Sequence, residues 1–323
     1  MTRKTIFHEK WWLDAIAPGR WREVVCIRGG QVVGSLRFEE LSIGGLKVCA
    51  TPQSTRVLGP ILETRPGKAE SLARSTQAVT ACLLEQICKH DHVEMRLGTE
   101  HVDITPFLHA GFEVKVLPTL LLNCKPPLEE LWAGLRDKTR NVIRRAREQL
   151  TVQCIEDIGQ FTRFYMENLE DDIPYFNLTA SAVAIKAACD HKQGKIFAAT
   201  AADGVAHAMV VFLWDDQQVY YFHSSRKKNL AHAGAVSLLL WTGIELAHSR
   251  GLWLDFDAGL AKLSRYKFLV SFGGVIVNRY EVTRSTRIYR VQHGIRRIRR
   301  AVARRLPIAS LLKKLRLHLV DRV

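Results

Sequence analysis

Two aspartates near the end of a short apolar run are the first residues whose spacing could do chemistry. Asp255 and Asp257 flank Phe256, and the alternation of a β-strand places both on one face, opposite the phenylalanine. Two carboxylates on one face could deprotonate or anchor an amine, so we interpret Asp257, and then Asp255, as catalytic candidates. Aspartate also favours turns at strand ends, and this structural explanation stays open.

Two other residues have side chains that could take part in catalysis. His223 ends the β-like run 219–223 and titrates near neutrality, so it could be the base, although a structural histidine explains it as well. Lys267 could neutralise a developing oxyanion or bind a phosphate. A solvated surface lysine is the alternative.

A basic loop before a long apolar helix could bind phosphate groups. Small residues in the segment 224–235 would let a ligand approach the backbone, and Arg226-Lys227-Lys228 adds positive charge. Free N–H groups at a helix start also bind anions. We therefore predict donor-binding residues at Ser225, Arg226, Lys227, Asn229, Ala233, Gly234 and Ala235. An ordinary basic loop that caps a helix is the alternative.

Basic residues crowd the segment 136–147. Arg140 lies four residues from both Arg136 and Arg144, so like charges share a helix face and repel mildly. A polyanionic partner explains this arrangement, and so does an exposed basic face.

No pattern of metal ligands is present. The seven cysteines include no C-x-x-C pair and read as reduced, mostly buried thiols. His90 and His92 flank Asp91, but residues two apart do not share a helix face. We predict no metal.

Length and composition favour two globular domains. The chain has 323 residues, 47% of them hydrophobic, which is enough for two cores. The longest apolar stretch, around 236–241, is too short to span a bilayer. The N-terminal residues carry charges and no apolar signal core, so we expect a cytoplasmic protein.

The hydrophobic pattern predicts an α/β unit at 1–124 and a second at 125–283, separated by Pro126-Pro127. In the first unit we expect strands at 21–27, 31–38, 46–50, 93–97 and 117–122, and a helix at 68–90. In the second we expect helices at 128–150, 161–169 and 231–249, and strands at 195–200, 205–214, 219–223, 252–256 and 274–282.

The positive charge is concentrated in a tail. Residues 284–323 contain thirteen Lys or Arg and one Asp, so this segment carries +12 of the net charge of +15. Apolar residues recur at helical spacing in it. Basic amphipathic helices bind anionic membrane surfaces, although the tail could also bind tRNA phosphates or pack on the body.

The order of these elements resembles the GNAT acyltransferase fold, and local motifs resemble FemAB-like transferases and their BioF-linked acetyltransferase-domain branch. In the second unit these are the stretch Leu131–Ala146, Leu254-Asp255-Phe256-Asp257-Ala258-Gly259, and Arg265-Tyr266-Lys267 followed by Phe272-Gly273-Gly274. In the first they are Trp11-Trp12-Leu13, Gly59-Pro60, and Pro106-Phe107 with Gly111-Phe112. The resemblance spans roughly residues 7–283.

The resemblance implies two tandem GNAT-like domains with mixed sheets, an acyl donor on the second domain, and an acceptor on the first. It places Lys267 at the reacting centre. We expect the acceptor to contact Thr51, Gly59, Arg140, Arg144 and Tyr266.

We thus expect an N-acyltransferase that acts on a small-molecule or lipid-linked amine, such as a cell-envelope or polysaccharide precursor, at the inner face of the membrane. The donor is acyl-CoA. The loop 229–235 departs from the acetyl-CoA pattern R/Q-x-x-G-x-G/A, so a Fem-type peptidyltransferase that uses aminoacyl-tRNA stays an alternative. A non-catalytic protein that binds anionic lipid or nucleic acid is another.

Overall fold

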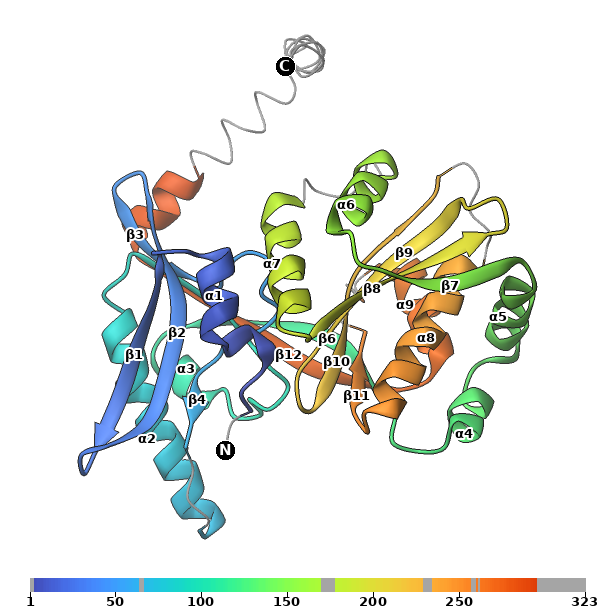
Figure 1. Cartoon of the computed structure of the whole chain (residues 1–323). Helices are drawn as coiled ribbons and strands as arrows, with labels where there is room; N and C mark the ends of the chain where they lie inside the picture. Colours follow the sequence, from blue (N-terminus) through green and yellow to red (C-terminus); the bar gives the residue numbers. More distant parts are fainter. Residues whose placement is uncertain are drawn as a thin grey trace, which may run out of the picture.

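The computed structural model describes residues 3–63, 67–169, 178–228, 234–256, 260 and 262–294, which form a mixed sheet flanked by helices (Figure 1). The first half contributes η1 (Ile6–His8), α1 (Lys10–Ile16), β1 (Trp21–Arg28), β2 (Gln31–Ile43), β3 (Leu46–Ala50), β4 (Ile61–Leu62), α2 (Ala69–Ile87), β5 (His92–Leu97), α3 (Thr105–His109) and β6 (Glu113–Asn123). The second half contributes α4 (Leu128–Ala133), α5 (Asp137–Gln149), β7 (Leu150–Ile155), α6 (Ile158–Glu167), α7 (Leu178–Asp190), β8 (Gly194–Ala201), β9 (Ala206–Trp214), β10 (Gln218–Arg226), α8 (Ala235–Ser249), β11 (Trp253–Asp255), α9 (Leu263–Leu269), η2 (Val270–Phe272) and β12 (Val275–Ser285). The predicted α/β class is confirmed.

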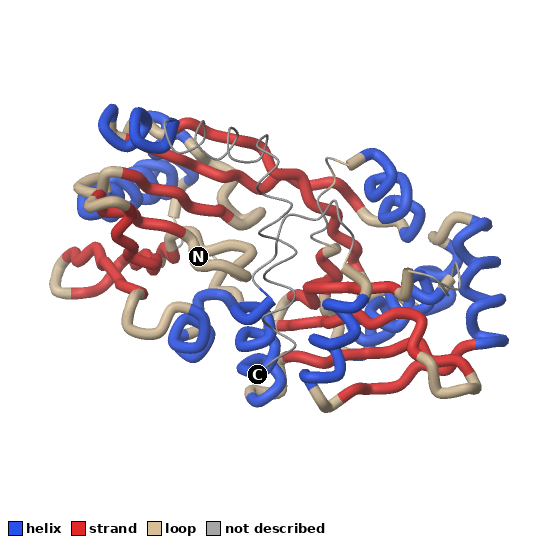
Figure 2. Tube along the Cα trace, turned by 90° about the horizontal axis from the view of Figure 1, so that it is seen from above, coloured by secondary structure: helices blue, strands red, loops and turns tan. Residues whose placement is uncertain are grey.

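The strands of both halves form one continuous sheet (Figure 2). Its order is β1-β2-β3-β5-β12-β6-β11-β10-β9-β8-β7, and β4 pairs with β2 beside this row. The two halves meet where β11 pairs antiparallel with β6, from Trp253 opposite Asn123 to Asp255 opposite Leu121.

The last described strand belongs spatially to the first half. We expected the run 274–282 in the second unit, but β12 pairs antiparallel with β5 on one side and β6 on the other. The pairing with β6 is long, from Val275 opposite Leu121 to Thr283 opposite Glu113. The first half therefore completes its sheet with residues from the far end of the chain.

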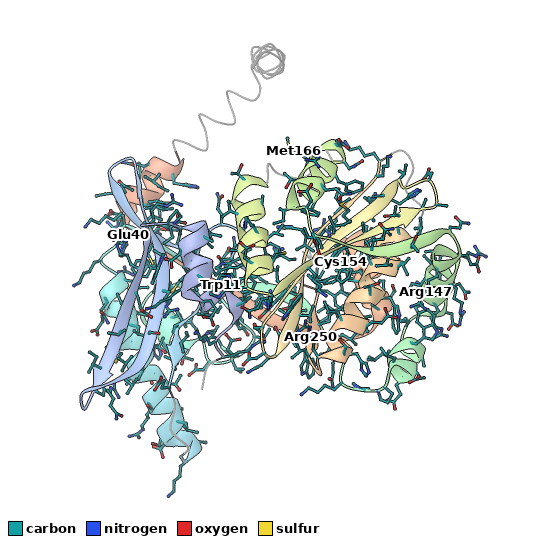
Figure 3. The ribbon with its side chains drawn as sticks, in the orientation of Figure 1. Trp11, Glu40, Arg147, Cys154, Met166 and Arg250 are labelled. Carbon is teal, nitrogen blue, oxygen red and sulfur yellow. The ribbon has the colours of Figure 1, made fainter. Side chains whose placement is uncertain are left out.

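One of the three buried cores is shared between the halves. Phe7 packs edge-on against Tyr220 with 5.0 Å between ring centroids, and Trp12 packs similarly against Phe222 at 5.9 Å. Trp11 of α1 stacks on His191 at 4.2 Å, where α1 packs against α7 (Figure 3). The other two cores lie under α2 and around α8. Burial of these aromatic rings stabilises the contact between the halves.

Helix α8 lies against the sheet and is buried on most of its surface. This agrees with its uniformly apolar sequence, since a helix that is hydrophobic all round is a buried one. Gly243 permits the close approach, because a Cβ there would lie 2.3 Å from the ring of Phe212. The structure confirms this predicted helix, which begins where the basic segment 224–235 ends.

The prediction made from the sequence pattern was wrong at residues 128–150. The expected single helix is broken between α4 and α5, where Arg136 has extended backbone angles (φ −59°, ψ 140°). Leu150 does not continue α5 but begins β7, which pairs with β8. Helices α7 and α9 were not predicted either.

The basic tail is described only as far as residue 294, and residues 287–294 are helical. Among the described helices, none has both the length and the apolar character to cross a bilayer.

Candidate active site

The second half contains an opening between two parallel strands. β10 pairs with β11 only from Gln218 to Tyr220, and the chain then leaves β10, because the N–H of Phe256 donates to the carbonyl of Leu120 (3.0 Å). Beyond Tyr220, no strand of the described residues pairs with this side of β10, whereas β9 pairs with the other side up to Arg226. We call residues 221–226, the part of β10 beyond its pairing with β11, the β10 opening. An extended ligand could add to such an edge as another strand would.

Polar side chains gather at a bulge in β10. The register with β9 shifts between Tyr221 and His223, so Phe222 is the extra residue. The hydroxyl of Tyr221 bonds to that of Ser224, and the ring of Tyr165 from α6 lies 6.3 Å from His223. These hydroxyls and the imidazole can exchange protons with a bound ligand.

An arginine of the first half reaches the same bulge. Arg56 follows β3, and its guanidinium donates to the carbonyl of Phe222 and lies 5.0 Å from the centre of that residue's ring. The first half therefore supplies a positive charge directly beside the β10 opening.

The environment keeps this cluster in defined protonation states. Burial, and then the charge of Arg56, lower the pKa of His223 well below its usual 6.5. Burial raises the pKa of Tyr165 and of Tyr221 above 10, and outweighs the opposing effect of Arg265 on both. At neutral pH the imidazole is thus uncharged and the two phenols carry their protons.

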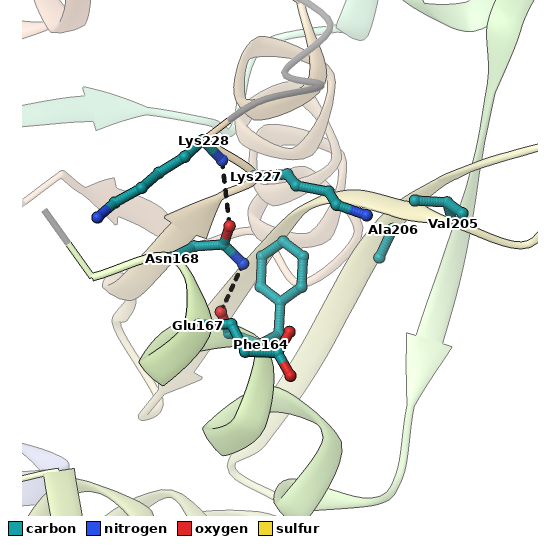
Figure 4. Close-up of a pocket in the computed structure, with 7 residues that line it drawn as sticks. All are labelled: Phe164, Glu167, Asn168, Val205, Ala206, Lys227 and Lys228. Atoms are coloured by element: carbon teal, nitrogen blue, oxygen red, sulfur yellow. Dashed lines mark hydrogen bonds between the residues drawn. The ribbon is translucent and has the colours of Figure 1, made fainter. Parts of the chain in front are cut away.

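A hollow lies where the end of β10 leads into the loop before α8 (Figure 4). It has a volume of about 450 Å³ and is lined by residues of α6, of the start of β9 and of the end of β10. The N–H of Lys228 donates to Oδ1 of Asn168 (3.1 Å), whose amide donates to the carbonyl of Phe164 (2.8 Å). Lys227 also lines this hollow, so two basic side chains flank the loop before α8.

A family comparison identifies this half of the chain. Residues 134–267 match the family model described as "Acetyltransferase (GNAT) domain". These residues form a GNAT domain. No curated protein matches the chain.

Solved structures share the fold of nearly the whole chain. FemX superposes with a TM-score of 0.64 at 11% identity, over 84% of this chain and 90% of that one. L-PGS from Bacillus licheniformis gives 0.51 at 12% identity, over 91% and 92%. A tandem GNAT protein from the clavulanic acid biosynthesis pathway gives 0.50 at 10% identity, over 85% and 93%. The predicted resemblance to FemAB-like, tandem GNAT folds is confirmed.

The predicted donor-binding residues fall into three groups in the GNAT domain. Ser225 and Arg226 end β10 opposite Met209 and Ala208, beside the β10 opening. Lys227 lines the neighbouring hollow. Asn229 and Ala233 lie outside the described residues, while Gly234 and Ala235 begin α8.

The role predicted for the small residues of this loop needs correction at Gly234. A Cβ on Gly234 would lie 2.7 Å from the carbonyl oxygen of Val142 and 2.9 Å from the Cβ of Ala146, both on α5. Ala235 is buried in the core as well. Gly234 is therefore small because α8 packs closely on α5 there, and donor binding by Gly234 and Ala235 stays a prediction.

Asp255 holds strands together. Its side chain has no exposed surface, accepts a hydrogen bond from the hydroxyl of Thr119 (2.6 Å), and forms an ion pair with Arg279. These partners lie on β6 and β12, so Asp255 joins three neighbouring strands. This geometry favours the structural explanation, and we leave Asp255 out of the proposed catalytic group. Asp257 lies outside the described residues.

On α9, the arginine rather than the lysine is placed toward the phenols. Arg265 is near enough to Tyr165 and Tyr221 to influence the pKa of both. Lys267 is exposed. It follows Arg265 by two residues, so its side chain leaves the helix roughly 200° around the axis from that of Arg265. Tyr266 is half-buried and packs on the core of the second half. The catalytic role of Lys267 stays a prediction.

Among the described residues of the first half, the parallel strands β3 and β5 show no comparable divergence. Beyond the pairing of β3 with β5, the hydroxyl of Thr51 accepts from the N–H of Arg96 (3.2 Å). Gly59 accepts from Nε2 of His8 (3.1 Å), and a Cβ there would lie 2.5 Å from Nε2 of His101. Thr51 and Gly59 are thus engaged in internal contacts, and Arg56 between them approaches the β10 opening instead.

The arginines of α5 have local partners. Arg140 donates to the carbonyls of Ala133 (2.8 Å) and Leu135 (2.7 Å), which ties the end of α4 to α5. Arg144 donates to Asn141 (2.9 Å), and its guanidinium lies 5.5 Å from the ring centre of Trp132. Acceptor binding by Arg140 and Arg144 stays a prediction, which their packing does not favour.

Sequence reasoning missed Arg56, Tyr165 and Arg265. Tyr165 falls within a predicted helix and Arg265 within a motif quoted for the family resemblance, but neither carries a local signal for catalysis. Arg56 is 166 residues from its partner Phe222, so no local pattern could reveal it.

The described residues contain no group of three or more His, Cys, Asp or Glu that could hold a metal. His90 bonds to the carbonyl of Ile87 (2.8 Å), whereas His92 bonds to Ser285 (2.8 Å). The two histidines around Asp91 thus have separate partners.

Proposed function

We propose that the protein is an N-acyltransferase that moves an acyl group from acyl-CoA to an amine at the β10 opening. The observation that carries the proposal is that β10 runs on beyond its pairing with β11 within residues that match a GNAT domain, next to protonated tyrosines and a neutral histidine. We propose that the amide-containing arm of CoA hydrogen-bonds along this strand and that Arg226, Lys227 and Lys228, at the end of β10, bind its phosphates.

The chemistry follows from the protonation states. The amine nitrogen attacks the thioester carbonyl, a C–N bond forms, and the attacking nitrogen becomes acidic. Neutral His223 can then accept its proton, even though its own pKa is low. When the C–S bond breaks, Tyr221 or Tyr165 can give a proton to the departing thiolate. Arg56 and Arg265 supply positive charge near the developing oxyanion.

Donor binding is the first test. The thermal unfolding temperature of the full chain should rise when acetyl-CoA or CoA is added at about 0.01–1 mM. A ligand that binds the folded state with a Kd on the order of 10 µM stabilises it at these concentrations by mass action. The effect should be lost in the charge-reversed variant Arg226→Glu/Lys227→Glu. If CoA compounds never stabilise the wild type but an aminoacylated tRNA does, the acyl-CoA proposal fails.

Catalysis is the second test. Release of CoA thiol would be followed with a panel of amines, including amino sugars and cell-wall peptides. Tyr221→Phe should lower kcat by about 10²-fold if its proton reaches the leaving thiolate. Tyr289→Phe, at the other end of the molecule, is the matched control and should be neutral. Equal activities of the wild type and Tyr221→Phe would remove Tyr221 from the mechanism.

We further propose that the first half shapes the acceptor side, with Arg56 as its contribution to the β10 opening. An amine on a cell-envelope or polysaccharide precursor fits this role, and a lipid-linked acceptor would place the enzyme at the inner face of the membrane. The basic segment 284–323 supports that location.

A Fem-type transfer from aminoacyl-tRNA is the second candidate, and the likeness in fold to FemX favours it. Lys138 and Arg145 on α5 flank Val142, which touches the start of α8, so basic side chains surround the donor loop on that side too. A non-catalytic lipid or nucleic-acid binder is the remaining alternative, and turnover with any donor would exclude it.

A further inference from the structure

A short helix leaves the end of the sheet and is fixed to it along one face. It spans residues 287–294 and follows β12, beside β3 in Figure 1. The N–H of Thr286 donates to the carbonyl of Asp91 (2.8 Å), and the ring of Tyr289 stacks on that of His92 with 4.3 Å between centroids. The ring of His293 stacks on Tyr289 in turn (5.8 Å). The orientation of the helix on the body is therefore defined by its tyrosine face.

The opposite face of this helix is aliphatic and exposed. Ile288 is 61% exposed and Val291 63% exposed. At 100° per residue these two side chains point roughly 150° away from the stacked rings of Tyr289 and His293. Arg287 and Arg290 are also exposed and lie together on one side of the aliphatic pair. Exposed aliphatic side chains beside arginines are typical of helices that lie in a membrane interface.

The body beside this helix is basic as well. Asp91 links it to the start of β3, because its N–H donates to the carbonyl of Lys47 (2.8 Å) and its carboxylate accepts from the N–H of Lys47 (2.9 Å). The side chains of Lys47 and Lys89 are exposed at this end of the sheet. Arg284 is anchored nearby on the carbonyl of Cys88 (3.0 Å). Lys47, Lys89 and Arg284 thus bring three positive charges to this end of the sheet, beside the carboxylate of Asp91.

The sequence continues the same pattern beyond the described residues. Ile295, Ile298 and Val302 follow Val291 at spacings of four, seven and eleven residues, with arginines at 296, 297, 299 and 300. The exposed aliphatic pair is thus the first part of a longer stripe in the sequence.

We propose that Ile288, Val291, Arg287, Arg290, Lys47 and Lys89 form a membrane-docking surface for an anionic lipid bilayer. The aliphatic side chains enter the interfacial region and the basic side chains contact lipid headgroups. This proposal deepens the peripheral location put forward above and rests on it. It adds that the end of the sheet near β3 and the start of β5 faces the bilayer.

The exposed aliphatic side chains distinguish a bilayer from a nucleic acid as the binding partner of this surface. Nucleic acids are bound through phosphates and through stacking on aromatic rings, and here the aromatic residue of the helix is already stacked on the body. Loss of binding on removing the aliphatic pair, with all basic residues retained, is therefore expected only for a lipid partner.

Vesicle flotation of the full-length protein tests the docking surface. Vesicles of phosphatidylcholine with 30% phosphatidylglycerol would be compared with pure phosphatidylcholine at low and at high salt, and we expect binding only to the anionic vesicles, weakened by salt. Ile288→Asp/Val291→Asp should reduce the bound fraction at least tenfold. Lys47→Glu/Lys89→Glu should reduce it several-fold. Val102→Asp is the control, because Val102 is 82% exposed and follows the end of β5 opposite to His92, and it should float like the wild type.

Two further measurements keep the outcomes distinct. If the Ile288→Asp/Val291→Asp variant floats like the wild type, or if its unfolding temperature falls markedly, the face does not dock on lipid and the proposal is wrong. Wild-type binding to tRNA but not to anionic vesicles would also overturn it. Acyl transfer to a soluble amine should be equal in the variant and the wild type. A wild type that floats but has no transferase activity would refute the proposed function and leave the docking surface intact.

Discussion

Neutralising Asp255 provides a direct test of its structural role. The carboxylate is fully buried, and the side chain of its partner Arg279 is only 8% exposed. Removing one partner of such a pair leaves an uncompensated buried charge and costs about 3–5 kcal/mol. A protein with a typical free energy of unfolding of about 5–15 kcal/mol loses a large part of it. We therefore expect Asp255→Asn to lower the unfolding temperature by roughly 10 °C.

A double-mutant cycle separates structure from catalysis. Arg279→Met alone should be as destabilising as Asp255→Asn, because it strands the carboxylate. The double variant removes both charges, and its asparagine can still accept from the hydroxyl of Thr119. We expect it to regain at least about 2 kcal/mol relative to the sum of the single changes, as residues in direct contact do. Urea denaturation of all four proteins measures this coupling.

Activity of the same proteins decides the assignment. If Asp255 is structural, the double variant should keep its kcat within a fewfold of the wild type at a temperature where it is folded. An Asp255→Asn protein with wild-type stability and turnover reduced by more than about 10²-fold would refute the reasoning and restore Asp255 as a catalytic residue.

Three other predictions follow from single sites. The pKa of buried His8 is lowered to about 4 in the folded protein, whereas its value in the unfolded chain is near 6.5. The free energy of unfolding should therefore have its full value above pH 6.5 and should fall by about 2 kcal/mol on going to pH 5. His8→Gln should remove this component from the pH dependence of unfolding, and an unchanged pH dependence would contradict the low pKa. Arg265→Ala should lower kcat/KM by at least about tenfold and Lys267→Ala by less; the reverse order, measured at saturating donor, would return Lys267 to the reacting centre. Gly234→Val should lower the unfolding temperature by forcing α8 away from α5, and an unchanged value would mean that the two helices adjust freely.

The sequence predicted those elements whose own residues determine them. The strand 46–50 and the helix expected at 68–90 agree closely with β3 and α2, because apolar periodicity and short turns are local signals. It missed β7, since Leu150–Ile155 follows an arginine-rich helix with no glycine or proline to mark the change. It recognised the strand that became β12, but a strand pattern does not say which neighbours the strand will have.

The candidate site was predictable only where one segment carries it. His223 and the segment Ser225–Lys227 lie in and after a strand that leads to a long helix, and the pattern of the sequence pointed to both. Arg56 reaches the site through contacts between the two halves. The buried pairing of Asp255 with Arg279 needs β12 to cross to the first half, and a single sequence shows no sign of that crossing.

The position of β12 has a consequence for how the protein is made. Its pairing partners β5 and β6 leave the ribosome long before residues 275–285 do, at about 5–20 residues per second. During synthesis the facing edges of β5 and β6 have no partner, and unpaired edges invite association with other chains. The N-terminal half therefore cannot finish folding as an autonomous unit during translation. A nascent chain stalled before residue 275 should remain sensitive to protease in its N-terminal half and should bind chaperones that recognise exposed strands, while release of the complete chain should protect both halves together.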